Sequence, residues 1–135
     1  MTAQIVYKGD LRTEMTHVQS GSIVETDAPK DNHGKGERFS PTDLVATALG
    51  SCMLSIMGIA ARTHEIDIVN TKIEIDKIMV ADPLRRIGEI AVVFHLPSGK
   101  HYSDKEKTIL EKAAMTCPVF LSLGENVKKT IHWNW

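Results

Sequence analysis

Cysteine is scarce in this sequence, and neither sign of charge dominates it. The 135 residues include only two cysteines, Cys52 and Cys117, which are too few for the disulfide framework of a small secreted domain. We therefore expect a cytoplasmic protein whose cysteines are reactive rather than structural. With 16 basic and 17 acidic residues, the net charge is -1. That balance gives no electrostatic reason to expect nucleic acid or an anionic membrane as a partner.

Several recognisable site patterns are also missing. The sequence contains no P-loop, no G-x-G-x-x-G and no G-x-S-x-G, and we expect no bound cofactor. The N-terminal stretch "MTAQIVYKGDLR" has no apolar signal region, so we expect no secretion signal. The histidines are scattered without the spacing of metal ligands, and we expect no metal site. They are His17, His33, His64, His95, His101 and His132.

The chain length suits one domain spanning residues 1–135. Alternating apolar residues predict strands over Ala3–Tyr7, Leu11–Val18 and Ser22–Thr26, the first two joined by the turn "KGD". The segment 27–39 is rich in turn-forming and charged residues and reads as a long loop. Loops of that length in a compact domain are often functional.

The second part of the chain begins with a helix. Ser40 is a good N-cap, Pro41 suits the first helical position, and Asp43 suits the positive helix end. Two strands forming a hairpin, a helix with a capping box, a short helix starting at Pro118 and a final strand follow. Their ranges are 66–81, 86–96, 103–117, 118–124 and 127–135. The resulting order, β-β-β-α-β-β-α-β, predicts an α+β domain.

One long run has no charge at all, from Leu44 to Ala61. It is close to the length of about twenty residues that crosses a membrane, but nothing else in the chain looks adapted to a membrane. A helix lying on one sheet in a monomer usually keeps a polar outer side, and this one has none. Small residues such as Ala48 and Gly58 would let another helix approach closely. The run therefore favours a helix buried at the centre of a dimer.

Two interpretations of the cysteines remain open from the residues alone. Cys52 shares a helical stripe with Val45, Leu49, Ile56 and Ile59, and buried free cysteines often only fill a core. Cys117 precedes the proline that starts the short helix, where the positive helix end would favour a thiolate. Facing helices could bring the two thiols close enough to form a disulfide. The spacing of the cysteines in the sequence leaves this open.

Two motifs resemble those of a known family. "SPTDLVATALGSC" (Ser40–Cys52) is similar to the central-helix motif of the OsmC/Ohr family, osmotically induced protein C and organic hydroperoxide resistance protein. "CPVFLSL" (Cys117–Leu123) resembles the second motif of that family. The resemblance spans essentially the whole chain. It implies an intertwined homodimer in which antiparallel sheets wrap two long central helices per chain.

The resemblance also implies a chemistry. Peroxidase members of this family reduce organic hydroperoxides with a pair of cysteines. Carried over, Cys52 is the peroxidatic thiol, which becomes a sulfenic acid, and Cys117 is the resolving thiol, which closes a disulfide. A dithiol such as a lipoyl group restores both thiols.

The first motif departs from the peroxidase branches and is closer to less characterised ones. Those branches place Glu where this chain has Thr42, and Asp43 is a possible substitute. Because desolvation disfavours a thiolate, a working Cys52 needs a cation, for which Arg38 is the first candidate and Arg12 the second. Asp43 would then orient the guanidinium. The alternative function is a non-enzymatic dimer that binds an apolar small molecule or senses oxidants.

Overall fold

A computed structural model describes all residues, 1–135. The chain divides into two compact units, Met1–Val45 and Ala46–Trp135. The boundary falls inside the long helix α1 (Pro41–Thr63). A single domain over residues 1–135 stays a prediction.

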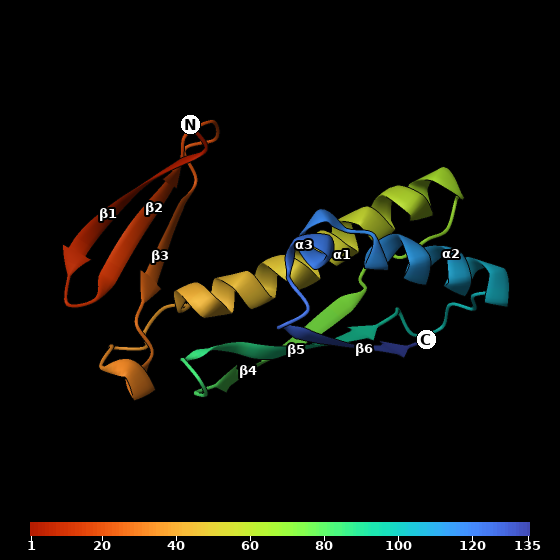
Figure 1. The fold of residues 1–135 in the computed structure, drawn as a ribbon. Coiled ribbons are helices and arrows are strands. Elements are labelled where there is room, and N and C mark those ends of the chain that lie inside the picture. The colour runs from red at the N-terminus through yellow and green to blue at the C-terminus, as the bar shows by residue number, and fades with distance from the viewer. The chain divides into compact units, whose positions relative to one another are not determined.

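The N-terminal unit is a three-stranded antiparallel sheet in the order β1-β2-β3 (Figure 1). Its strands are β1 (Ala3–Gly9), β2 (Arg12–His17) and β3 (Ile23–Asp27), so the three predicted strands are confirmed. The predicted loop after β3 contains one turn of 3-10 helix, η1 (Lys30–Asn32). A backbone hydrogen bond from Asp27 to Phe39, 3.1 Å, closes this loop.

The start of α1 agrees with the sequence. Pro41 is its first residue, where a missing N–H costs nothing. The Ser40 hydroxyl accepts the backbone N–H of Asp43 at 3.1 Å, and the Asp43 carboxylate accepts the backbone N–H of Ser40 at 2.8 Å. This reciprocal pair has the form of a capping box, so the principal role that the structure gives Asp43 is to begin the helix.

The C-terminal unit packs helices on one side of a second sheet, ordered β4-β5-β6 (Figure 1). Its strands are β4 (Lys72–Val80), β5 (Arg86–His95) and β6 (Lys128–Asn134), and its further helices are α2 (Asp104–Met115) and α3 (Pro118–Ser122). Alternate residues of β5 face the helices, which gives the strand its period-two pattern. The buried core joins them to α1 and α2 and consists chiefly of Leu49, Met53, Met57, Ile90, Val92, Phe94, Leu110, Ala114 and Cys117.

Two details differ from the sequence-based expectation. The strand expected from Ile66 begins only at Lys72, because the preceding residues form turns: Val69 donates to the Asp67 carboxylate and Thr71 to the carbonyl of Ile68. Sheet pairing is antiparallel between β4 and β5 but parallel between β5 and β6. The chain crosses over through α2 and α3 before β6, and such a crossover returns a strand in the same direction.

Helix α1 is long and apolar enough to cross a membrane by length and composition, which is weak evidence by itself. Only 33% of its most apolar window is buried within the chain. Gly50 lies against the sheet, where an added Cβ would meet the Ile75 side chain at 2.7 Å. On the outer side, Ala48, Ser51, Ser55 and Ile59 are exposed. The chain alone therefore leaves an uncharged face of α1 without cover.

Candidate functional site

The two cysteines lie beside each other in the C-terminal unit. Cys52 is a half-buried residue of α1 that packs against the core, and Cys117 is a fully buried member of that core just after α2. Both are free thiols. The Cys117 thiol lies close enough to the Cys52 side chain to interact with it. Helical packing therefore brings together two thiols that the sequence separates by more than sixty residues.

Cys117 is also the N-cap of α3, as the sequence predicts. Its sulfur accepts the backbone N–H of Phe120 at 3.2 Å. Burial nevertheless raises the pKa of Cys117, and the contact with Cys52 raises it further, while the N–H of Phe120 lowers it. The N–H groups at the start of α3 thus favour a Cys117 thiolate, as expected, but burial is the larger effect and the pKa is raised overall. Cys117 keeps its proton.

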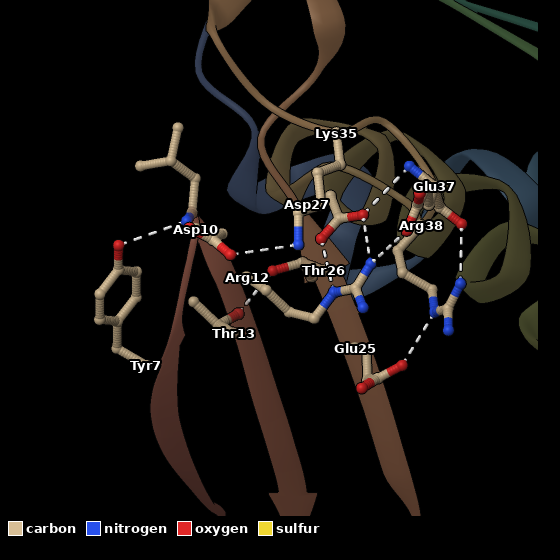
Figure 2. Close-up of polar contacts among 11 residues, drawn as sticks. Tyr7, Asp10, Arg12, Thr13, Glu25, Thr26, Asp27, Lys35, Glu37 and Arg38 are labelled. Atoms are coloured by element: carbon tan, nitrogen blue, oxygen red, sulfur yellow. Dashed lines mark hydrogen bonds and ion pairs between the residues drawn. The ribbon is translucent and has the colours of Figure 1, made fainter.

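Arg12 and Asp27 form an ion pair with two hydrogen bonds in the N-terminal unit (Figure 2). Arg12, the first residue of β2, is the cross-strand partner of Asp27, the last residue of β3. Arg12 Nε and Nη2 donate to the two oxygens of Asp27, each at 2.8 Å, and the backbone N–H of Glu37 donates to Asp27 Oδ2 at 3.0 Å. The Asp27 side chain is only 1% exposed. The Arg12 guanidinium and the Glu37 N–H lower the pKa of Asp27 to about 2.

Two more exposed ion pairs lie beside this one (Figure 2). Arg12 Nη2 also donates to Glu37 Oε2 at 3.0 Å, although the Glu37 side chain is 61% exposed. Arg38 Nε donates to Glu25 Oε2 at 2.8 Å and its Nη1 to the Glu37 carbonyl at 3.1 Å. The Arg38 guanidinium lowers the pKa of Glu25. These partners tie the loop after β3 to the sheet.

The predicted site residues therefore fall into two groups. The C-terminal unit brings Cys52 and Cys117 together, whereas Arg12, Arg38 and Asp43 belong to the N-terminal unit. Arg38 is held by Glu25 and Asp43 hydrogen-bonds with Ser40, so the proposed Arg38–Asp43 orientation stays a prediction. Sequence reasoning missed the carboxylates that hold the arginines, Glu25, Asp27 and Glu37. The only signal was hairpin register, which places position 27 opposite Arg12.

A groove of about 400 Å³ opens elsewhere in the C-terminal unit, between the last turns of α1 and the segment before β4. Leu54, Ile66 and Ile68 give it apolar walls, and Arg62 and Asp67 lie at its polar side. It is a mixed surface of a size that suits a small molecule. No three side chains of the His, Cys, Asp or Glu type are grouped so that they could hold a metal ion.

Comparison with known proteins identifies the family. The model of the family described as OsmC-like protein matches residues 34–132, which is most of the chain. The chain belongs to the OsmC-like family. A crystal structure from Psychrobacter arcticus, assigned to the osmotic stress-induced and detoxification response, is 46% identical. It superposes with a TM-score of 0.93, and the match covers 99% of this chain and 96% of that one.

More distant OsmC-like structures share the fold. An organic hydroperoxide resistance protein OsmC from Legionella pneumophila is 16% identical, with a TM-score of 0.79 over 100% of this chain and 98% of its own. The organic hydroperoxide resistance protein OhrB of Bacillus subtilis is 19% identical, with a TM-score of 0.69 over 99% and 98%. None of the curated proteins matches the chain.

The buried Arg12–Asp27 pair predicts an acid-sensitive N-terminal unit. The folded pKa of Asp27, about 2, lies below the value of about 3.9 for an unfolded aspartate. The carboxylate therefore contributes stability above about pH 4, which is lost as the pH falls toward 2. Asp27→Asn should remove this part of the pH dependence and raise amide hydrogen exchange in β2 and β3 at pH 7.

Glu37→Gln is the matched control, because it removes a carboxylate that is mostly exposed. Arg12 still has Asp27 as its partner in this variant. The substitution should leave exchange in β2 and β3 nearly unchanged. Equal exchange in the Asp27→Asn protein and the parent at pH 7 would show that the buried pair does not stabilise this sheet.

Proposed function

We propose that the protein is a cysteine-based peroxidase that reduces organic hydroperoxides through a Cys52–Cys117 dithiol/disulfide cycle. The observation that carries this proposal is the side-chain contact between the two thiols. A sulfenic acid at Cys52 has a resolving thiol in contact with it. It can therefore be trapped as a disulfide before a second equivalent of peroxide overoxidises it.

The two sulfurs suit different steps. Cys52 is half-buried, so a hydroperoxide can reach it, whereas Cys117 is fully buried. The raised pKa of Cys117 keeps that sulfur protonated and poorly nucleophilic until the sulfenic acid forms beside it. The Cys52 thiolate attacks the distal peroxide oxygen and releases the alcohol. Cys117 then displaces water from the sulfenic acid, and a dithiol, such as a lipoyl group, reduces the disulfide.

The family relationship supports this reaction class without fixing the substrate. Two of the OsmC-like structures that share the fold are organic hydroperoxide resistance proteins by name. Apolar core residues surround the cysteine pair, and such surroundings suit an organic hydroperoxide better than hydrogen peroxide. The proposed setting is the cytoplasm, with neither nucleic acid nor membrane as a partner.

Cysteine oxidation separates this proposal from a binding protein or an oxidant sensor. One equivalent of cumene hydroperoxide should consume both thiols much faster than one equivalent of hydrogen peroxide, and intact mass should show the disulfide. Cys52→Ser should abolish turnover. Cys117→Ser should allow one oxidation and then accumulate the sulfinic acid.

Slow oxidation of the parent that does not distinguish the two peroxides would favour the alternative function. The groove beside Leu54 and Ile66 would then be the place to test for an apolar ligand. Turnover at the parental rate by both cysteine variants would exclude the cysteine cycle altogether.

We also propose that the working protein is a homodimer. The uncharged outer side of α1 includes Ile59, which is 63% exposed in the single chain. The first sheet has little cover of its own, because Ile5, Tyr7 and Ile23 are each more than 60% exposed. Three strands need a packed apolar face for stability. A second copy of the chain would supply cover for these surfaces.

Dilution should consequently not release a folded monomer. Sedimentation at nanomolar concentration should find a dimer or unfolded chain. Ile59→Lys should weaken the dimer and lower the thermal midpoint, because it adds a charge to the uncharged face. Thr63→Lys, one turn further on beside Arg62, is the control and should change little. A compact monomer with undiminished thermal stability would contradict the proposal.

Thiolate activation is the remaining part of the proposed mechanism. We propose Arg38, and second Arg12, as the cation that favours the Cys52 thiolate, with Asp43 orienting the guanidinium. In the Cys117→Ser background, removing the responsible arginine should slow Cys52 alkylation at pH 7 about tenfold or more. Arg62→Ala is the control. If Arg38→Ala and Arg12→Ala both leave the alkylation profile unchanged, neither arginine activates the thiol.

A further inference from the structure

The short helix α3 is held at its start by the sulfur of Cys117. The backbone N–H of Phe120 donates to that sulfur at 3.2 Å, and the N–H of Leu121 donates to the Cys117 carbonyl at 3.1 Å. α3 has five residues and none of them is buried; Leu121 is 69% exposed. A helix this short does not persist on its own. Val119 and Phe120 pack partly buried against the core, and the contacts at the helix ends add to that packing in holding the first turn.

The far end of α3 is held independently of the sulfur. Lys129 Nζ donates to the carbonyls of Leu123 and Gly124 at 2.8 and 3.2 Å, and it lies 5.3 Å from the centre of the Phe120 ring. None of these contacts involves Cys117. A change at the sulfur should consequently loosen the first turn of α3 without releasing the whole segment.

One sulfur thus has two partners that compete once it is oxidised. In the dithiol form, Cys117 contacts the Cys52 thiol and caps Phe120 at the same time. A disulfide requires the two sulfurs to approach to about 2.05 Å, well inside the contact distance of two thiols. A Cys117 sulfur that moves toward Cys52 to form this bond leaves the position in which it accepts the Phe120 N–H. Loss of a helix N-cap interaction destabilises the turn that it caps.

We infer that the first turn of α3 is a redox-controlled gate that opens when the Cys52–Cys117 disulfide forms and admits the dithiol reductant. In the dithiol form this turn lies against the fully buried Cys117 sulfur. In the disulfide form the uncapped turn loosens, which exposes the sulfur to a second thiol. The inference rests on the proposed function, because it assigns a reductant step to the same cysteine pair.

The reduction step then proceeds by thiol–disulfide exchange. One thiolate of the dithiol attacks the Cys117 sulfur, forms a mixed disulfide and releases Cys52 as a thiolate. The second thiol of the reductant loses its proton and attacks the reductant's other sulfur, which is bonded to Cys117. This step releases Cys117 as a thiolate. The dithiol loses two electrons and two protons, and both cysteines are restored. The cap on Phe120 can re-form, and the gate closes.

Four states of residue 117, namely thiol, disulfide, alanine and serine, allow a test by amide hydrogen exchange. Diamide converts the parent to the disulfide, which intact mass verifies. Exchange at Phe120 and Leu121 should then be about fivefold faster or more than in the dithiol form. Reduced Cys117→Ala has no cap and should exchange equally fast. Cys117→Ser keeps a hydroxyl cap and forms no intramolecular disulfide, so it should stay slow with or without diamide.

A second measurement tests whether the turn covers the sulfur. In the Cys52→Ser background only Cys117 can be alkylated. Phe120→Pro removes the capped N–H, and proline is tolerated in the first turn of a helix. Alkylation of Cys117 should become about tenfold faster in the Cys52→Ser, Phe120→Pro protein than in Cys52→Ser, Phe120→Ala, which loses the same ring but keeps the N–H. A far-ultraviolet circular dichroism spectrum like that of the parent verifies that the variant folds.

The gate is wrong if the verified disulfide leaves exchange at Phe120 slow, or if Cys117 alkylation is no faster with Phe120→Pro than with Phe120→Ala. It is also wrong if Cys117→Ser exchanges as fast as Cys117→Ala. The proposed function fails differently: cumene hydroperoxide would then give no disulfide, while the diamide-induced disulfide would still open the turn.

Discussion

The need to bury the uncharged surface of helix α1 is the constraint on which the rest of the structure depends. A helix with no charge from Leu44 to Ala61 cannot leave its surface in water without a large hydrophobic penalty. β5 and α2 cover the side that carries Leu49, Met53 and Met57. The opposite side has small and apolar residues instead of the polar residues of an ordinary surface helix. The same composition that makes α1 resemble a membrane helix thus suits a protein that buries both sides in a larger assembly.

The packing of α1 also determines where the two cysteines lie. Cys52 lies at the edge of the buried side, and the end of α2 packs there, so the chain leaves α2 with Cys117 against the same core. Pro118 prevents α2 from continuing and starts a new helix, which makes Cys117 an N-cap. The contact between the thiols is therefore a consequence of helix packing and of one proline. No special loop is needed to bring them together.

Local chemistry made much of this predictable. Ser40, Pro41, Ser103 and Pro118 act through neighbours within one turn, so the starts of α1, α2 and α3 could be read directly from the sequence. Features that depend on distant residues could not. The alternation of Ile66 and Ile68 imitates a strand, although these side chains reach the core from turns.

Long-range strand pairing and the protonation of Cys117 could not be read from the sequence, because both depend on residues that are distant along the chain. The Asp27 carboxylate opposite Arg12 follows from sheet register, which one misjudged strand end conceals: the third strand is expected to stop at Thr26 and stops at Asp27. The parallel pairing of β6 depends on a crossover through two helices. The protonation of Cys117 depends on burial, which opposes the helix-end effect visible in the sequence.

The arginine cluster shows how the chain is built without the glutamate that the family resemblance expects at position 42. The buried Asp27 carboxylate, rather than one on the helix, accepts two hydrogen bonds from the Arg12 guanidinium. Removing that carboxylate would leave a cation 20% exposed without its main partner. Glu37 differs, because its exposed carboxylate can return to water at little cost. The Arg12–Asp27 contact therefore holds β2 to β3, whereas the exposed Arg12–Glu37 contact contributes little to the fold.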